Sequence, residues 1–143
     1  MHITALKSPD SRDHRSVIHP DTVKKILALP GATVSFESGI GNGINISDQT
    51  FIELGLKAIS RDECLSQGNF IITPSSLSID ESNKIQSGST VLGMLNPFYA
   101  VDELKALNQS RINVVSMEFI PRITRAQKMD VLSSQANLAG YAA

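Results

Sequence analysis

A row of short polar side chains near the C-terminus contains the residues best suited to bind a polar ligand. Four of them recur at spacings of three, four and three residues, and a fifth flanks them: Gln127, Asp130, Ser134, Asn137 and Ser133. In an α-helix these spacings place side chains on one face. Amide, carboxylate and hydroxyl groups supply hydrogen-bond donors and acceptors on short side chains. With Arg122 and Arg125 beside it, the row predicts a surface that binds a polar ligand, and a ligand bearing an amide would fit.

The same row also fits the solvent-exposed face of an ordinary amphipathic helix, and periodicity alone favours that alternative. Exposed helix faces are usually rich in Lys, Glu and Arg, which are good helix formers. Ser, Asn and Asp compete for backbone hydrogen bonds and are poor choices in a helix interior. This composition is the argument from the residues for a binding surface, and both interpretations remain open at this point.

The helix that carries the row is predicted to run from Arg125 to Tyr141. Thr124 and Gln127 have the spacing of a capping box, in which each side chain satisfies a free backbone N–H group at the start of a helix. A second, apolar stripe on this helix predicts packing against a sheet. It comprises Met129, Leu132, Ala136 and Ala139.

Short β-branched runs alternate with segments of helical spacing along the rest of the chain, which predicts one α/β domain over residues 1–143. We expect five or six parallel strands. The runs that predict strands are Ile3–Leu6, Ala32–Glu37, Asn69–Thr73, Ser89–Leu95 and Ile112–Phe119. Helices are expected from Pro20, from Ser47, around 80–86, and over Val101–Leu107.

The charge balance argues against a nucleic-acid partner or direct membrane binding. The 143 residues include 13 Lys and Arg against 14 Asp and Glu, for a net charge of -1, whereas binding to phosphates needs clustered positive charge. The longest apolar runs, such as Phe70–Ile72, are far shorter than the roughly 20 residues that span a bilayer. No basic and apolar leader is present at Met1, so we expect a cytoplasmic protein.

The cysteine and histidine content predicts no metal site. Cys64 is the single cysteine and cannot form an internal disulfide. Cys64 and His14 lack the paired spacing of a zinc site. We expect Cys64 to be a buried structural thiol and His14 to lie in a solvated loop.

The segment Pro121 to Tyr141, P-R-I-T-R-A-Q-K-M-D-V-L-S-S-Q-A-N-L-A-G-Y, closely resembles a known signature. That signature, P-R-I-[ST]-R-A-Q-x-x-D-x-L-S-S-x-A-N-x-A-G-Y, belongs to the alpha subunits of NAD(P) transhydrogenases. Arg15, Val17 and Pro20 are similar to the R-V-x-x-x-P segment of the same family, and residues 36–41 to its V-E-x-G-A-G turn. The chain therefore resembles the N-terminal domain of the alanine dehydrogenase and transhydrogenase family.

This resemblance implies a flavodoxin-like α/β domain with helices on both faces of a parallel sheet, beside a separate Rossmann domain that binds NAD(H). Residues of the signature line the nicotinamide site in the transhydrogenases. Carried over by position, these are Arg122, Gln127, Asp130 and Ser133, and Arg15 is a possible cleft residue. No catalytic side chain is expected, because in hydride transfer the cofactor supplies the chemistry and the protein fixes its orientation. The implied partners are an NAD(H)-binding domain or subunit, NADP-binding and membrane subunits, and further copies of the chain in a homo-oligomer.

Two positions depart from the family pattern. Thr73 stands where the family commonly has Lys, and Asn96 lies in the stretch where alanine dehydrogenases carry a catalytic His. Without these residues the oxidative deamination of alanine loses its carboxylate anchor and its acid or base. The departures disfavour an alanine dehydrogenase and leave the transhydrogenase interpretation in place.

No dinucleotide fingerprint is predicted within the chain. Gly39, Gly41 and Gly43 follow a strand, but the third glycine comes one position early and no helix opens directly on the turn, so we expect a plain turn. The chain would then be a fragment, or a subunit whose partner supplies the nucleotide domain. The alternative is a non-catalytic module that oligomerises through small residues of the last helix, namely Ala126, Ala136, Ala139 and Gly140.

Overall fold

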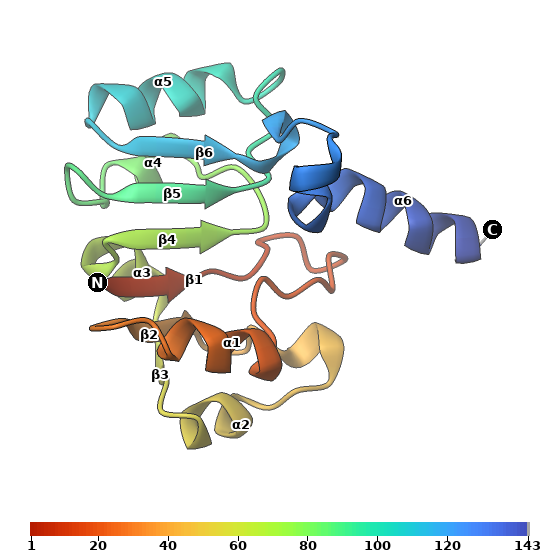
Figure 1. Cartoon of the computed structure of the whole chain (residues 1–143). Helices are drawn as coiled ribbons and strands as arrows, with labels where there is room; N and C mark the ends of the chain where they lie inside the picture. Colours follow the sequence, from red (N-terminus) through yellow and green to blue (C-terminus); the bar gives the residue numbers. More distant parts are fainter. Residues whose placement is uncertain (143) are drawn as a thin grey trace.

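A six-stranded parallel sheet is the framework of the molecule (Figure 1). The computed structural model describes residues 1–142, with all their side chains except those of Leu138 and Ala142. The strands are β1 (His2–Ala5), β2 (Thr33–Glu37), β3 (Lys57–Ile59), β4 (Phe70–Thr73), β5 (Thr90–Gly93) and β6 (Asn113–Ser116). The α-helices are α1 (Pro20–Leu27), α2 (Asp48–Glu53), α3 (Arg61–Gln67), α4 (Ile79–Ser82), α5 (Val101–Gln109) and α6 (Val131–Ala142). Three 3-10 segments are η1 (Asn42–Ile44), η2 (Met117–Phe119) and η3 (Thr124–Met129).

The order of the strands confirms the predicted flavodoxin-like α/β fold. Hydrogen bonding links them in the order β3-β2-β1-β4-β5-β6, with every pair parallel. Without the short edge strand β3, the other five follow the flavodoxin order 2-1-3-4-5. β3 was not predicted, since Lys57 to Ile59 is too short to show a strand pattern.

Two apolar cores cover the two faces of the sheet, because successive strand residues point to opposite faces. On one face, Phe36 packs at 5.3 Å from the Phe51 ring of α2, with Val23 of α1 in the same cluster. On the other face, Leu65 of α3 and Leu107 of α5 pack with strand residues such as Ile71 and Val91. Helices on both faces were predicted, and the structure confirms them.

Cys64 is fully buried in the second of these cores, as expected of a structural thiol. Its backbone carbonyl accepts a hydrogen bond from the Thr4 hydroxyl at 2.9 Å, which ties α3 to β1. Burial raises the pKa of the Cys64 thiol to about 12. The thiol therefore stays protonated and unreactive at neutral pH.

A cluster of buried charge lies where β1 and β2 end. The Arg61 guanidinium, at the start of α3, donates from Nη1 to Glu37 Oε2 at 2.8 Å and from Nε to Glu81 Oε1 at 2.5 Å. It also donates to the Lys7 carbonyl at 3.0 Å. Burial acts to raise the pKa of Glu81, but its hydrogen bonds and the charge of Arg61 lower that pKa overall. The cluster joins two strand ends, α3 and α4 through one side chain.

The glycine turn after β2 is a structural turn, as predicted. The Gly39 N–H group donates to both carboxylate oxygens of Asp48 at 2.9 Å, so it is already occupied within the chain. Gly43 lies directly against the loop after β1, where an added Cβ would meet the His14 carbonyl oxygen at 2.4 Å. The turn therefore needs glycine for close packing of two loops.

Replacing Gly43 with alanine is expected to destabilise the fold by about 1 to 3 kcal/mol, since the His14 backbone would have to move. Urea unfolding followed by circular dichroism measures this loss. Gly140→Ala is the matched control, because an added Cβ there meets nothing within 4 Å. Equal stability of the two variants would show that the loops separate without cost.

Candidate functional site

The last helix is shorter than predicted, because the chain breaks at Asp130. Residues 124–129 form the 3-10 segment η3, and the α-helix begins only at Val131. The predicted capping box is wrong, since the residue that precedes η3 is Ile123 and no side chain caps this segment. The predicted helix over 125–141 is therefore two segments that meet at Asp130.

Asp130 itself caps α6. Its Oδ1 accepts the Ser133 N–H group at 3.0 Å and its Oδ2 accepts the Ser133 hydroxyl at 2.5 Å. A carboxylate that accepts an N–H group in the first helical turn satisfies a free donor and opposes the positive end of the helix dipole. The Ser133 hydrogen bonds lower the pKa of Asp130, and the charge of Arg122 adds to this. Asp130 is therefore ionised at neutral pH.

Four predicted site residues come together around one hollow beside this break. It is an open hollow of about 310 Å³ lined by Arg122, Ile123, Thr124, Gln127, Asp130 and Ser133. We call it the signature hollow. It combines one cation, one carboxylate, one amide and hydroxyl groups within a few residues of chain, with Asp130 only 8% exposed. Such a set can hold a neutral amide and a nearby negative group at the same time.

The rest of the predicted polar row does not take part. The Ser134 hydroxyl donates back to the Asp130 carbonyl at 3.0 Å, and the Asn137 side chain is exposed on α6. The break at Asp130 rotates η3 relative to α6, so the spacing of an unbroken helix no longer applies. Ile123 and Thr124 complete the hollow and were not predicted as binding residues.

The predicted packing of the apolar stripe on the sheet is also wrong. Met129 is 53% exposed, and Ala136 and Ala139 are exposed as well. Figure 1 shows α6 starting at the carboxyl edge of the sheet and running away from it. Only its first turn, with Val131 and Leu132, is partly buried. Ala126, which the oligomerisation alternative used, is buried within this chain.

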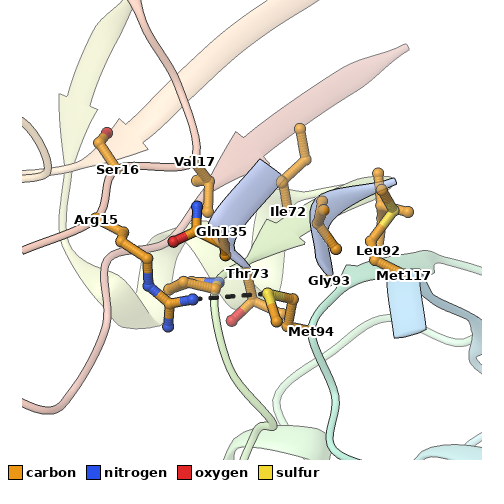
Figure 2. Close-up of a pocket in the computed structure, with 12 residues that line it drawn as sticks. Arg15, Ser16, Val17, Ile72, Thr73, Leu92, Gly93, Met94, Met117 and Gln135 are labelled. Carbon is orange, nitrogen blue, oxygen red and sulfur yellow. Dashed lines mark hydrogen bonds between the residues drawn. The ribbon is translucent and has the colours of Figure 1, made fainter. Parts of the chain in front are cut away.

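A second hollow, of about 250 Å³, lies on another side of the start of α6. We call it the strand-end hollow (Figure 2). Residues after β1, β4 and β5 line it together with Val131 and Gln135 of α6: Arg15, Ser16, Val17, Ile72, Thr73, Pro74, Leu92, Gly93, Met94 and Met117. In open α/β sheets, the carboxyl ends at such a change of strand order are where ligands bind. Among the described residues, no helix lies in front of β4 and β5 in the view of Figure 1, and Leu92 is partly exposed.

Arg15 belongs to the strand-end hollow and not to the signature hollow. Figure 2 shows its guanidinium reaching Met94, with Nη1 3.6 Å from the sulfur. Asp13 fixes this side chain, accepting from Arg15 Nε and Nη2 at 2.8 Å each. Arg15 is thus a cleft residue, but it lies apart from the four residues that the signature brings together. His14 is exposed in the same loop, as predicted.

The Asp13–Arg15 pair predicts a loss of stability in acid. The hydrogen bond from Arg15 lowers the pKa of Asp13 from 3.8 to about 2. A lowered carboxyl pKa gives stability that is complete above the unfolded-state value and is lost as the pH falls towards the folded-state value. Because the Arg15 side chain is 45% exposed, we expect solvent to reduce the contribution to about 1 kcal/mol. Urea unfolding at about pH 6 and pH 2.5 should show a larger loss for the natural chain than for Asp13→Asn, and parallel losses would contradict this.

Thr73 and Asn96 have local structural roles. The Thr73 side chain is buried, and its hydroxyl donates to the Ser75 carbonyl at 2.8 Å where β4 ends. Asn96 has a left-handed backbone, with φ of +49°. Asn is among the residues that best tolerate this conformation. Neither side chain supplies a cation or a titratable imidazole to the strand-end hollow.

Comparison with known proteins agrees with this geometry. Residues 7–139 match the family described as alanine dehydrogenase/PNT, N-terminal domain, and the chain belongs to that family. Its relatives include the first of the polypeptides that make up NAD(P) transhydrogenase subunit alpha in two bacteria. The chain is 36% identical over 148 residues to the one from Rickettsia prowazekii and 34% identical over 149 residues to the one from Rhodospirillum rubrum. Each match covers all of this chain and 38% of the relative.

Solved structures give the same result for the fold. The transhydrogenase of Sinorhizobium meliloti superposes with a TM-score of 0.93 at 33% identity, over 99% of this chain and 42% of that one. An L-alanine dehydrogenase superposes with a TM-score of 0.77 at 18% identity, over 87% of this chain and 34% of that one, which shows a shared fold. The chain therefore spans less than half of these relatives. Within the described residues, no helix is both long enough and apolar enough to cross a bilayer.

Proposed function

We propose that this chain is the N-terminal part of the alpha subunit of a proton-translocating NAD(P) transhydrogenase and forms one wall of its NAD(H) site. The observation that carries the proposal is the signature hollow, where Arg122, Gln127, Asp130 and Ser133 converge. Its open side and small volume suit one end of a dinucleotide, so a companion NAD-binding domain supplies the rest of the site. The NADP-binding and membrane subunits complete the assembly, in which the chain is homo-oligomeric.

The donors and acceptors of the hollow fit a nicotinamide carboxamide. Each Asp130 oxygen has one acceptor position left after its bond to Ser133, and the carboxamide NH₂ can donate to it. The Gln127 amide can bond to the carboxamide oxygen, and Arg122 can bond to a phosphate of the cofactor. The bound cofactor supplies the hydride that passes from NADH to NADP⁺. The residues of this chain orient the ring and donate no proton.

The test pairs this chain with its NAD-binding partner and titrates NADH, followed by nucleotide fluorescence. Gln127→Ala is expected to raise the dissociation constant about fivefold to tenfold, as for the loss of one hydrogen bond in a partly desolvated site. Asn137→Ala is the matched control, because Asn137 is also an exposed amide of the last helical segment but lies outside the signature hollow. If both variants bind NADH and transfer hydride like the natural chain, the proposal is wrong.

One observation favours a second function, an oligomerisation module. The exposed part of α6 presents Ala136, Ala139 and Gly140, and Tyr141 is 88% exposed. Small residues allow a second helix to approach closely. Sedimentation of the natural chain and of Ala139→Glu distinguishes this function, since the charged variant should be monomeric if α6 is the interface.

A further inference from the structure

The Glu118 carboxylate joins the two chain segments that border both hollows. Glu118 lies in η2, directly after β6. Its Oε1 accepts the Asn96 N–H group at 2.7 Å, and its Oε2 accepts the Leu95 N–H group at 3.2 Å and the Ser116 hydroxyl at 2.5 Å. One carboxylate therefore holds the loop after β5 against the segment after β6.

The loop that it holds has a defined shape. Asn96 adopts a left-handed backbone, and its carbonyl accepts the N–H groups of Tyr99 and Ala100 at 3.0 and 2.9 Å. Met94, two residues before Asn96, lines the strand-end hollow and touches Arg15. The carboxylate thus fixes the wall from which Met94 projects.

The segment on the other side leads directly to the signature hollow. Three residues separate Glu118 from Arg122, and one of them, Pro121, has a fixed φ angle. The Ile120 N–H group bonds to the Met117 carbonyl at 3.3 Å, and the Ile123 N–H group to the Pro121 carbonyl at 2.9 Å. A displacement of η2 therefore moves Arg122 and the start of η3 with it.

The carboxylate is charged while it does this. Burial acts to raise the pKa of Glu118, but the hydrogen bonds from Ser116, Asn96 and Leu95 lower it overall. Hydrogen bonds to an ionised acceptor are stronger than neutral ones. Glutamine at this position would place an NH₂ group, which cannot accept, opposite one of the N–H donors.

We infer that Glu118 is a positioning residue for the nicotinamide site, holding Arg122 and η3 in register with the carboxyl ends of β5 and β6. This inference rests on the proposed function, but it concerns a residue that lines neither hollow. A misplacement of about 1 Å in an orienting group can slow a reaction about a hundredfold. Glu118 should therefore affect the rate of hydride transfer more than the affinity for NADH.

The experiment compares the natural chain, Glu118→Gln and Glu53→Gln, each assembled with its nucleotide-binding partners. Glu53 is an exposed carboxylate on α2 and serves as the matched control. We expect Glu118→Gln to lower the rate of hydride transfer about tenfold, with a change of less than threefold in the NADH dissociation constant. The control should match the natural chain in both. Equal losses in rate and affinity, or no loss in either, would overturn the positioning role.

Amide hydrogen exchange of the same variants gives a readout independent of activity. In Glu118→Gln, exchange should become faster at Leu95 and Asn96 and also over residues 122–130, while the core strands keep their protection. Faster exchange across the whole chain would mean a general loss of folding and would contradict the inference. If the natural assembly fails to bind NADH while these local changes occur, the proposed function fails and the structural anchor stands.

Discussion

Replacing Arg61 with alanine is expected to lower the free energy of unfolding by about 3 to 5 kcal/mol, the usual result of removing one partner of a buried ion pair. The Glu37 side chain is only 9% exposed and would keep a distant contact with Lys7 Nζ at 3.8 Å. Glu81 would lose its partner as well. Since these carboxylates join β2 and α4 to α3, the loss concerns contacts between elements and not one helix alone.

Urea unfolding at neutral pH measures this effect, and Arg12→Ala is the matched control. Arg12 makes a similar two-point contact with Asp10, at 3.0 and 2.9 Å, but its side chain is 88% exposed. Exposed pairs contribute little, so the control should unfold like the natural chain. Arg61→Lys should lie between the two, because lysine keeps the charge and loses the planar arrangement of donors. Equal stability of Arg61→Ala and Arg12→Ala would mean that water replaces Arg61 without cost.

The strands of this fold were predictable because their residues carry the pattern of the sheet. Phe70 to Thr73 and Asn113 to Ser116 lie inside β-branched runs that turn residues bound, and both form strands. β3 carries no such pattern: Lys57 is exposed and the strand has one β-branched residue. An edge strand of three residues is held by pairing with β2, which is a tertiary contact that local sequence does not show.

The site was predictable in its residue types and not in its geometry. Helical spacing grouped Gln127 and Asp130 with Ser134, whereas the structure groups them with Ser133. The difference comes from Asp130, which acts as a cap and starts a new helix. An Asp followed three residues later by Ser is a usable signal for such a cap, but Thr124 with Gln127 offered a competing signal six residues earlier. Local preferences could not rank the two, since the choice depends on how η3 follows Pro121.

In the proposed site, changing Asp130 to asparagine is expected to weaken NADH binding about tenfold to a hundredfold, the effect of losing a charged hydrogen bond. Asparagine keeps one acceptor oxygen, which can still cap the Ser133 N–H group. Its NH₂ group would replace the oxygen that accepts the Ser133 hydroxyl. That NH₂ would face the carboxamide NH₂ of the cofactor, donor against donor, and the negative charge beside Arg122 would be lost.

NADH titration of the assembled protein measures the change, and Ser134→Ala is its control. The Ser134 hydroxyl bonds to the backbone carbonyl of Asp130 and lies outside the signature hollow, so its loss tests whether a small disturbance of α6 alone weakens binding. The control should bind NADH like the natural chain. Circular dichroism should show the same helix content in all three proteins, because the cap survives in Asp130→Asn. Natural affinity in Asp130→Asn would separate the cap from cofactor binding, leaving Asp130 as the residue that starts α6 and nothing more.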